Sequence, residues 1–492
     1  MAFEMQLKRD GRDPLYRQIA DQIRAGIREG RLEPGERLPT VRVLAEELEI
    51  TRLTVHKAFR ELQADGILEA TVGRGTFVRA TGSASSSPND PSVRLTADRV
   101  MADIQKFTGE SGMRNLAHAE PDPDLIPAEA FWDCLVDLRA DATSHMQYVS
   151  PQGDQGLREA LSVFLEGRGI QADPDEILVT SGVTQGMSLV AGALAKPGDR
   201  VAVEQPTYLG LLHILEAQGL RPIGIPLDPE GPRLDVLERV IAQDRPRFFY
   251  TIATFHNPTG QSMSRRRRRD LLSLAERHGL FLIEDDIYHH LAYQSPPPPT
   301  LKSMDRKGLV VYLDGLSKAV LPGIRAGYGV VSRPLLDRML SLRRAADLCG
   351  PLTLQRALAE FLRRGCMKKH MQRILPIYRR RRDAILAALE ETMPAGVVWT
   401  RPEGGFSCWL TLPGRESFGD LYRAALERGL VFAPGEVFLV DSDPRVHLRL
   451  CFGNRPEKVI REGVGILADL IRERLQGGKR VRSAIPDRSP LV

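Results

Sequence analysis

A single break in composition divides this chain into two unequal parts. Residues 80–92 are ATGSASSSPNDPS, and this run of small polar residues and prolines contains almost no apolar side chain to bury. Such a stretch is typical of a flexible linker rather than of a folded core. We therefore expect a small unit before the break and a much larger body after it.

Length and composition exclude several classes of protein. The 492 residues are too many for one ordinary core and predict two to four domains, while 42% apolar and 27% charged residues are typical of a globular chain. No apolar run reaches the roughly 20 residues of a membrane helix, and the first residues have no apolar segment of a secretory signal. Five cysteines without CxxC spacing predict a reduced, cytoplasmic protein that has no disulfide and no metal site.

Net charge does not by itself indicate a nucleic-acid partner. The whole chain carries 68 basic and 63 acidic side chains, a net charge of +5. Residues 1–80 carry 14 basic and 13 acidic side chains, a difference of only +1. DNA binding by the small unit must therefore depend on individually placed cations.

The small unit, residues 11–79, is predicted to hold three helices and a hairpin. Apolar residues recur every four positions from Leu15 to Ile27, which indicates a first helix. Thr40 and Thr51 can cap a second and a third helix. Two short apolar runs flank Gly73-Arg74-Gly75 and predict a two-stranded wing. Three helices followed by a wing is the winged helix-turn-helix plan, whose second motif helix enters the major groove.

Polar and basic side chains of this unit are candidates for DNA contacts. They are Arg42, Thr51, Arg52, Thr54, His56 and Lys57 on or beside the helices, with Arg74 and Gly75 on the wing. The glycines beside Arg74 allow the main chain to approach phosphates closely. For each residue alone, the alternative is an ordinary solvated surface.

The segment LPTVRVLAEELEITRLTVHKAFRELQADGILEATVGRGTFV resembles the DNA-binding domain of GntR-family bacterial regulators. The resemblance covers residues 11–79 and implies binding to double-stranded promoter DNA. Leu53 and His56 occupy positions of the recognition helix where polar Thr or Ser and Arg are common. This departure concerns the operator sequence more than DNA binding itself.

Strand-like runs alternate with helix-length segments from residue 145 onward. The seven runs are residues 176–182, 200–205, 222–227, 248–255, 280–285, 309–314 and 327–332. They predict an α/β fold with a mostly parallel seven-stranded sheet and helices on both faces. Ligands of such sheets bind at the carboxyl ends of the strands.

Turn motifs follow several of these strands. The turn at residues 181–186 opens a helix whose free N–H groups favour a phosphate, although a plain strand-to-helix turn is the alternative. Tyr208 follows the next strand, and Asn257 begins an Asn-Pro-Thr-Gly turn from which its amide could bind a phenolate oxygen. Either residue is also common in the core or in turns without function.

Charged residues follow the later strands. Asp285 could keep a pyridine nitrogen protonated. The alternative is that Asp285 and Asp286 are a pair of solvated acids. A desolvated Lys318 could form a Schiff base, and Arg325 could bind a phosphate. The basic run at residues 265–269 opens a helix, and we interpret it as a solvated face rather than a nucleic-acid site.

In this order and spacing, the motifs resemble the fold type I aminotransferases that use pyridoxal 5′-phosphate (PLP), over roughly residues 112–475. The resemblance implies that Lys318 forms the Schiff base, that Asp285 pairs with the pyridinium nitrogen and that Tyr208 stacks on the ring. Asn257 and Tyr288 would bind the ring oxygen. The residues expected at the phosphate are Ser181, Gly182, Val183, Ser317 and Arg325.

The same resemblance implies a ligand site and a second subunit. Arg449, with Asn257, stands where the family binds the substrate carboxylate, and Tyr148 matches a tyrosine that reaches the phosphate of the neighbouring subunit. The site would then be complete only in a homodimer. Gly315 replaces a serine common two residues before the lysine, and Ala119 replaces a glycine in the segment that lines the substrate.

A GntR-like unit joined to an aminotransferase-like body is the architecture of the MocR subfamily of transcription regulators. The expected parts are the winged helix (11–79), a linker (80–111), a large PLP-binding domain (112–350), a smaller α+β domain (351–475) and a tail (476–492). The expected function is a regulator that senses an amine, an amino acid or PLP. The alternatives are an active aminotransferase of the 2-aminoadipate or aromatic type, and a regulator that responds to PLP alone.

Overall fold

The computed structural model divides the chain into two compact units, Met1–Asp90 and Pro91–Val492, which are described separately. The residues that the structure describes are 5, 14–28, 32, 36, 38–48, 50–64, 67–71, 75–78, 106–107, 112–413 and 418–483. Most of the predicted linker therefore lies outside the described residues. No helix within these ranges is long and apolar enough to cross a membrane.

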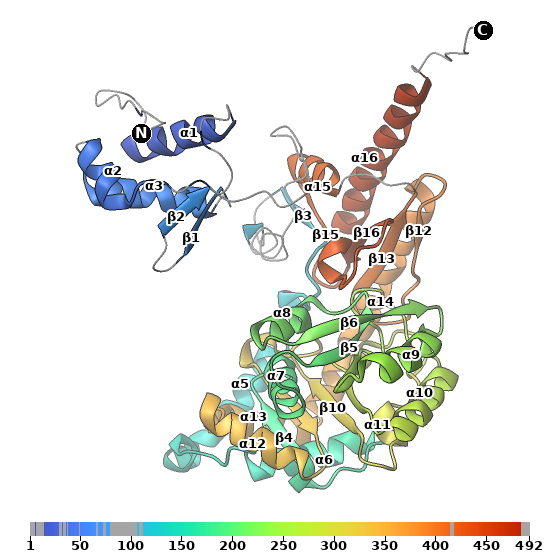
Figure 1. Cartoon of the computed structure of the whole chain (residues 1–492). Helices are drawn as coiled ribbons and strands as arrows, with labels where there is room; N and C mark the ends of the chain where they lie inside the picture. Colours follow the sequence, from blue (N-terminus) through green and yellow to red (C-terminus); the bar gives the residue numbers. More distant parts are fainter. Residues whose placement is uncertain are drawn as a thin grey trace. The chain divides into compact units, whose positions relative to one another are not determined.

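The first unit contains three helices and a hairpin, as predicted (Figure 1). They are α1 (Leu15–Arg28), α2 (Val41–Glu47), α3 (Arg52–Ala64), β1 (Leu68–Thr71) and β2 (Gly75–Val78). The Thr40 hydroxyl caps α2 by accepting a hydrogen bond from the Val43 amide at 3.4 Å. The Thr51 hydroxyl accepts one from the Thr54 amide at 3.3 Å, at the start of α3. β1 and β2 pair antiparallel to form the wing.

One side of α3 packs into the core of this unit, and the other side does not. Val55, Phe59 and Leu62 are buried against Ile19 and Ile23 of α1. The opposite side of α3 is exposed, because helical residues three or four positions apart share a face. The winged helix-turn-helix fold is therefore confirmed.

A mixed sheet forms the centre of the second unit. In spatial order its strands are β4 (Ile177–Thr180), β11 (Gly327–Val330), β10 (Val310–Gly315), β9 (Phe281–Asp285), β8 (Phe248–Thr251), β5 (Arg200–Gln205), β6 (Arg221–Asp228) and β7 (Gly231–Pro232). β11 and β7 run antiparallel to their neighbours, and the other neighbours are parallel. All seven predicted strands are present. The eighth, β7, has two residues and is too short to show a pattern in the sequence.

Helices cover both faces of this sheet. One face packs against α9 (Leu234–Asp244), α10 (Arg265–His278) and α11 (Leu301–Met304), and further along against α5 (Ala128–Asp137), α6 (Gln155–Glu166) and α13 (Leu352–Arg363). The other face packs against α7 (Val183–Leu194), α8 (Leu209–Ala217) and α12 (Leu335–Ala346). Because side chains alternate along a strand, Phe249 joins the first group while Phe248 and Tyr250 join the second.

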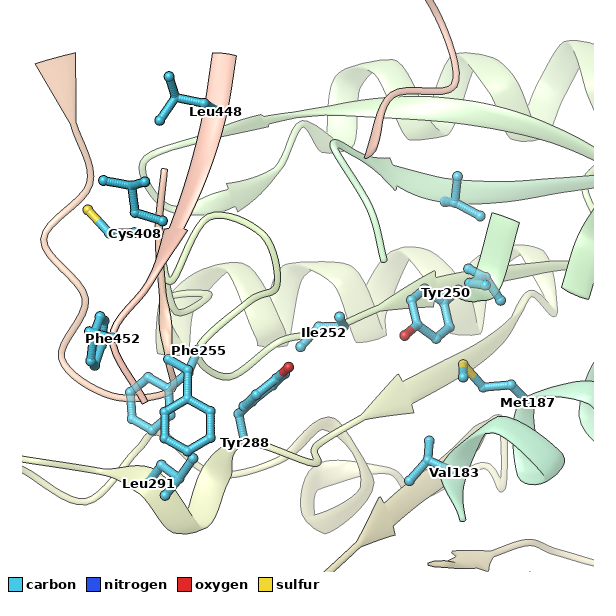
Figure 2. Close-up of a cluster of buried hydrophobic side chains, with 14 of the residues drawn as sticks. Val183, Met187, Tyr250, Ile252, Phe255, Tyr288, Leu291, Cys408, Leu448 and Phe452 are labelled. Atoms are coloured by element: carbon cyan, nitrogen blue, oxygen red, sulfur yellow. The ribbon is translucent and has the colours of Figure 1, made fainter. Parts of the chain in front are cut away.

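A smaller antiparallel sheet follows in the chain. Its strands, in spatial order, are β12 (Val398–Trp399), β13 (Ser407–Leu412), β16 (Val446–Cys451) and β15 (Ala433–Pro434). The helices around it are α14 (Cys366–Thr392), α15 (Phe418–Glu427) and α16 (Glu457–Ser483). Figure 2 shows one core that continues from Met187 of α7 through Tyr250 of β8 to Cys408 and Leu448 of the smaller sheet. The two sheets therefore share buried contacts.

Two sequence expectations need correction. The run at residues 265–269 is not wholly a solvated face, because the Arg268 side chain is fully buried and donates to the Ala253 carbonyl at 2.6 Å. Helical periodicity turns Arg268 toward the sheet, where its guanidinium also donates to the carbonyls of Met263 and Pro299. In addition, α16 continues to Ser483, beyond the expected domain end at residue 475. Glycine lowers helix propensity there without ending the helix.

We expect Gly327→Ala to lower the melting temperature. A Cβ at this position would lie 2.5 Å from the Gly182 carbonyl carbon and 2.7 Å from the Val183 nitrogen. Backbone atoms cannot rotate away, so overpacking costs about 1–3 kcal/mol. The control is Gly465→Ala in α16, where no atom lies within 4 Å of the added Cβ. Thermal unfolding measures both variants, and equal melting temperatures would contradict this account of the β11–α7 contact.

Candidate functional site

Two adjoining cavities lie at the carboxyl ends of the parallel strands. The inner cavity has a volume of about 70 Å³ and the outer cavity about 220 Å³. Tyr208, Asn257, Tyr288 and Lys318 line both of them. We therefore describe the two cavities as parts of one site.

One end of the inner cavity is suited to an anion. Gly182 precedes α7 with a φ of +78°, and no side chain caps this helix. The guanidinium of Arg325 occupies the space of a side chain at position 182, because an added Cβ would lie 2.7 Å from its Nη2. Val183 and Ser317 line the cavity beside Arg325. A helix N-terminus facing a guanidinium is a favourable environment for a phosphate.

Asp285 also lines the inner cavity. Its carboxylate accepts hydrogen bonds from the Tyr250 hydroxyl at 2.8 Å and the Ile287 amide at 3.3 Å. Among the described residues, none forms an ion pair with it. Burial raises the pKa of Asp285 to about 7. A protonated ring nitrogen would supply the missing cation and restore the ionised carboxylate.

A hydrogen-bonded chain connects the two cavities. The Asn257 amide donates to the Tyr288 hydroxyl at 3.4 Å, and the Arg449 Nη1 donates to Asn257 Oδ1 at 2.8 Å. Arg449 Nη2 donates to the Ala117 carbonyl at 2.6 Å, while its buried Nε has no hydrogen-bond partner. Such an orphaned donor beside a cavity fits a ligand carboxylate.

Lys318 is half-buried where the two cavities meet. Burial lowers the pKa of its ammonium, while the Glu120 carboxylate opposes that shift. A larger share of the amine is then neutral and nucleophilic. The Tyr208 ring also borders both cavities and contacts Gly210, since a Cβ there would lie 2.6 Å from the Tyr208 hydroxyl.

The structure brings most of the sequence-predicted cofactor residues together. Eight of them line the inner cavity: Val183, Tyr208, Asn257, Asp285, Tyr288, Ser317, Lys318 and Arg325. Ser181 and Gly182 belong to the turn beside Arg325, where the Ser181 amide already donates to the Gln185 side chain at 2.8 Å. Tyr148 lies outside both cavities and is 87% exposed. This donor set, with an anion cradle, an amine and an unpaired carboxylate, fits PLP.

Gly315 and Ala119, the two positions of this domain that depart from the family pattern, both have an explicable place in the structure. A side chain at Gly315 would meet the Ala326 carbonyl and the Val183 side chain, each 3.1 Å from the added Cβ. A serine there would therefore need its neighbours to move. Ala119 lines the outer cavity.

Sequence reasoning missed several residues of the site. Tyr250, which donates a hydrogen bond to Asp285, could have been found from the sequence. It lies two residues after Phe248 on β8, so the two side chains lie on the same face of the sheet. Thr184 and Ile252 line the inner cavity, and His118, Glu120 and His213 line the outer one. His118 and Glu120 flank Ala119 in the segment expected to line the substrate, whereas His213 belongs to no recognisable motif.

A separate polar cluster lies on the opposite face of the sheet. His289, His290 and Asp314 are of types that could hold a metal, and their ligand atoms lie within 4.8 Å of one another. Protein donors already bind the nearby carboxylates: Tyr328 donates to Asp314 at 2.6 Å, and Arg168 donates to Asp286 at 3.0 Å. We infer that this cluster has a structural role and fixes the end of β9.

Five of the eight candidate DNA contacts lie on or beside α3. Thr51, Arg52, His56 and Lys57 are exposed, as is Leu53 at 77%. Thr54 is half-buried and shares a 2.9 Å hydrogen bond with Thr51. Lys57 Nζ lies 4.0 Å from the centre of the Tyr16 ring. Gly75 begins β2, whereas Arg74 and the Arg42 side chain lie outside the described residues.

We expect Asp285→Asn to stabilise the ligand-free protein at high pH only. A folded-state pKa raised from 3.8 to about 7 corresponds to on the order of 4 kcal/mol, present below the unfolded pKa and lost as pH rises through 7. The asparagine variant avoids that loss. Its melting temperature should exceed that of the wild type at pH 8.5 and match it near pH 4. An equal difference at both pH values, or the same behaviour in the exposed control Asp270→Asn, would refute the assignment.

Comparisons with known proteins identify both units. Residues 110–467 match the family described as aminotransferase class I and II, and residues 15–78 match bacterial regulatory proteins of the gntR family. The HTH-type transcriptional regulator YdfD of Bacillus subtilis is 30% identical over 472 residues, which cover 94% of this chain and 97% of that protein. Aromatic-amino-acid aminotransferase 1 of Thermococcus litoralis is 35% identical over 382 residues, 76% of this chain and 91% of that protein.

A solved structure supports the same division. The kynurenine aminotransferase of Pyrococcus horikoshii superposes with a TM-score of 0.73 at 35% identity, over 76% of this chain and 94% of that one. The similarity to YdfD, in contrast, extends over nearly the whole of both chains. The chain therefore belongs to the MocR subfamily of GntR-type regulators, in which a winged helix-turn-helix unit precedes an aminotransferase class I and II domain.

Proposed function

We propose that this protein is a PLP-dependent transcription regulator that binds promoter DNA through α3 and an amino acid or amine through the outer cavity. The observation that carries the proposal is the inner cavity, where Lys318, Asp285 and Arg325 surround about 70 Å³. These three groups match the aldehyde, the ring nitrogen and the phosphate of PLP. The exposed face of α3 supports the DNA-binding half of the proposal.

The protein would hold PLP at four points. Arg325, Ser317 and the amides at the start of α7 bind the phosphate. Asp285 keeps the ring nitrogen protonated, and Asn257 with Tyr288 binds the ring oxygen. When bound, PLP supplies an aldehyde that captures amines and a ring that withdraws electrons. Lys318 would provide the amine on which the cofactor is held.

Arg449 gives the ligand a means of acting on the fold. It belongs to β16 of the smaller sheet, whereas Asn257 and Lys318 belong to the larger part. A carboxylate bound by Arg449 beside Asn257 therefore contacts both parts. A ligand shifts an equilibrium only through different affinities for two states, and a contact that spans two parts can supply that difference.

A homodimer is part of the proposal. Tyr148 is exposed together with three large apolar residues of neighbouring segments, Trp132, Val136 and Met146, which are 64%, 64% and 77% exposed. Neighbouring apolar side chains of this size are a feature of protein interfaces. Tyr148 would then complete the phosphate site of the second subunit.

An active aminotransferase is the second candidate. It is supported by the presence of Lys318, Asp285 and Arg449 together and by the 35% identity to the Thermococcus enzyme. Steady turnover with an amino acid and a 2-oxo acid acceptor would favour this candidate. Amino-acid-dependent changes in DNA binding without turnover would favour the regulator, and a response to PLP alone would favour a cofactor sensor.

We expect Lys318→Ala to abolish both covalent PLP attachment and the response to amino acids. Borohydride reduction followed by mass spectrometry should find PLP on the Lys318 peptide of the wild type and not in the variant. A promoter-binding assay with PLP, with and without amino acids, should show a ligand effect in the wild type only. The exposed lysine variant Lys458→Ala should behave as the wild type. Absence of PLP from the wild-type peptide would refute the proposed function.

We expect Arg52→Ala to weaken promoter binding and to reduce its salt dependence. Loss of one phosphate contact lowers the slope of log affinity against log salt by about one, and loss of a base contact costs about 1–3 kcal/mol. Arg266→Ala on α10 is a matched control, because the two side chains are 69% and 66% exposed. Fluorescence anisotropy over a salt series distinguishes them. Equal affinities for the two variants would remove α3 from the DNA interface.

A further inference from the structure

The outer cavity carries two fixed charges of opposite sign besides Lys318. Among the described residues that line it, Arg449 is the only arginine and Glu120 the only carboxylate. The Arg449 side chain is only 7% exposed, whereas that of Glu120 is 55% exposed. The cation therefore lies in the buried part of the cavity and the anion in its open part.

Glu120 is held in its ionised form. Its Oε2 lies 3.5 Å from Nδ1 of His118, whose own side chain is 11% exposed. The hydrogen bond from His118 lowers the pKa of Glu120, burial opposes this effect, and Lys318 lowers it further. The cavity therefore presents a carboxylate that keeps its charge in neutral solution.

The position of the two charges orients a bound amino acid. A ligand whose carboxylate is on Arg449 and whose amine is at Lys318 must extend its remaining substituent into the rest of the cavity. Leu209, Val437 and Phe438 supply an apolar wall suited to methylene groups. Beyond Arg449 and Lys318, the cavity has no arginine or lysine that could bind a second carboxylate.

We infer that Glu120 selects a ligand whose side chain ends in a cation, that is, an amino acid with a second amine or a guanidinium on a short methylene chain. This inference rests on the proposed function, because it requires the ligand to bind at Lys318 and Arg449. An acidic side chain would meet the like charge of Glu120. A neutral side chain would add no favourable charge interaction with Glu120, so it binds more weakly than a cationic one.

The test compares ligands of equal length and different charge. Full-length, PLP-loaded protein is titrated with L-lysine, L-norleucine and L-2-aminoadipate, and the change in visible absorbance gives a Kd for each. We expect L-lysine to bind at least tenfold more tightly than L-norleucine, and L-2-aminoadipate to bind most weakly. Glu120→Gln should remove the preference for L-lysine, so that within this variant the Kd values of L-lysine and L-norleucine become equal. Glu120→Lys should reverse the order in favour of L-2-aminoadipate.

The controls separate this inference from the function on which it rests. The exposed variant Glu276→Gln should keep the wild-type order, and thermal unfolding confirms that each variant is folded. Equal affinities for L-lysine and L-norleucine, or an equal loss for all three ligands in Glu120→Gln, would overturn the inference alone. The second result would assign Glu120 to the amine that all three ligands share. Failure of PLP to attach would overturn the proposed function as well.

Discussion

The site depends on three consecutive acidic residues at the end of β9 that experience different environments. Alternation along the strand directs Glu284 and Asp286 to one face, where arginines lie beside them: Arg268 is 3.6 Å from Glu284, and Arg168 is 3.0 Å from Asp286. Burial raises the pKa of Glu284 although Arg268 opposes this effect, whereas Arg168 and His289 hold the pKa of Asp286 below its ordinary value. Asp285 faces the other way and has only neutral donors. The fold thus places an arginine beside two of the buried acids and leaves the third for a ligand.

The contact between the two sheets gives this local chemistry a wider effect. The core that includes Tyr250, Tyr288 and Phe452 is continuous between them, and the Arg449–Asn257 hydrogen bond adds a polar link at the cavity. Rigid packing of this kind does not deform gradually, so a ligand between the parts favours one arrangement over another. The same construction would serve an enzyme that closes on its substrate. Fold alone therefore does not decide between sensing and turnover.

Much of the fold could be predicted from the sequence, because the signals were local. Periodic apolar residues and threonine caps predicted α1–α3, and strand-like runs predicted seven of the eight strands. Motifs at strand ends predicted most residues of the inner cavity, since strand ends meet at one edge. Contacts that depend on tertiary packing could not be predicted. The hydrogen bond from Tyr250 to Asp285 and the burial of Arg268 join segments that are apart in the sequence. The pairing of His118 with Glu120 is local, but residues 116–120 form no helix or strand whose pattern would indicate it.

The hydrogen bond from Arg449 to the Ala117 carbonyl has a consequence for the ligand-bound state. Ala117 belongs to the first described stretch of backbone after residue 112, and its carbonyl is buried with that guanidinium as a partner. A carboxylate that captures the same N–H group leaves a buried carbonyl without a donor, which costs about 1–3 kcal/mol unless water or a moved backbone replaces it. Ligand binding at Arg449 thereby strains the backbone around Ala117, near the start of the larger unit. Amide hydrogen exchange of residues 115–118, with and without ligand, would measure this effect directly.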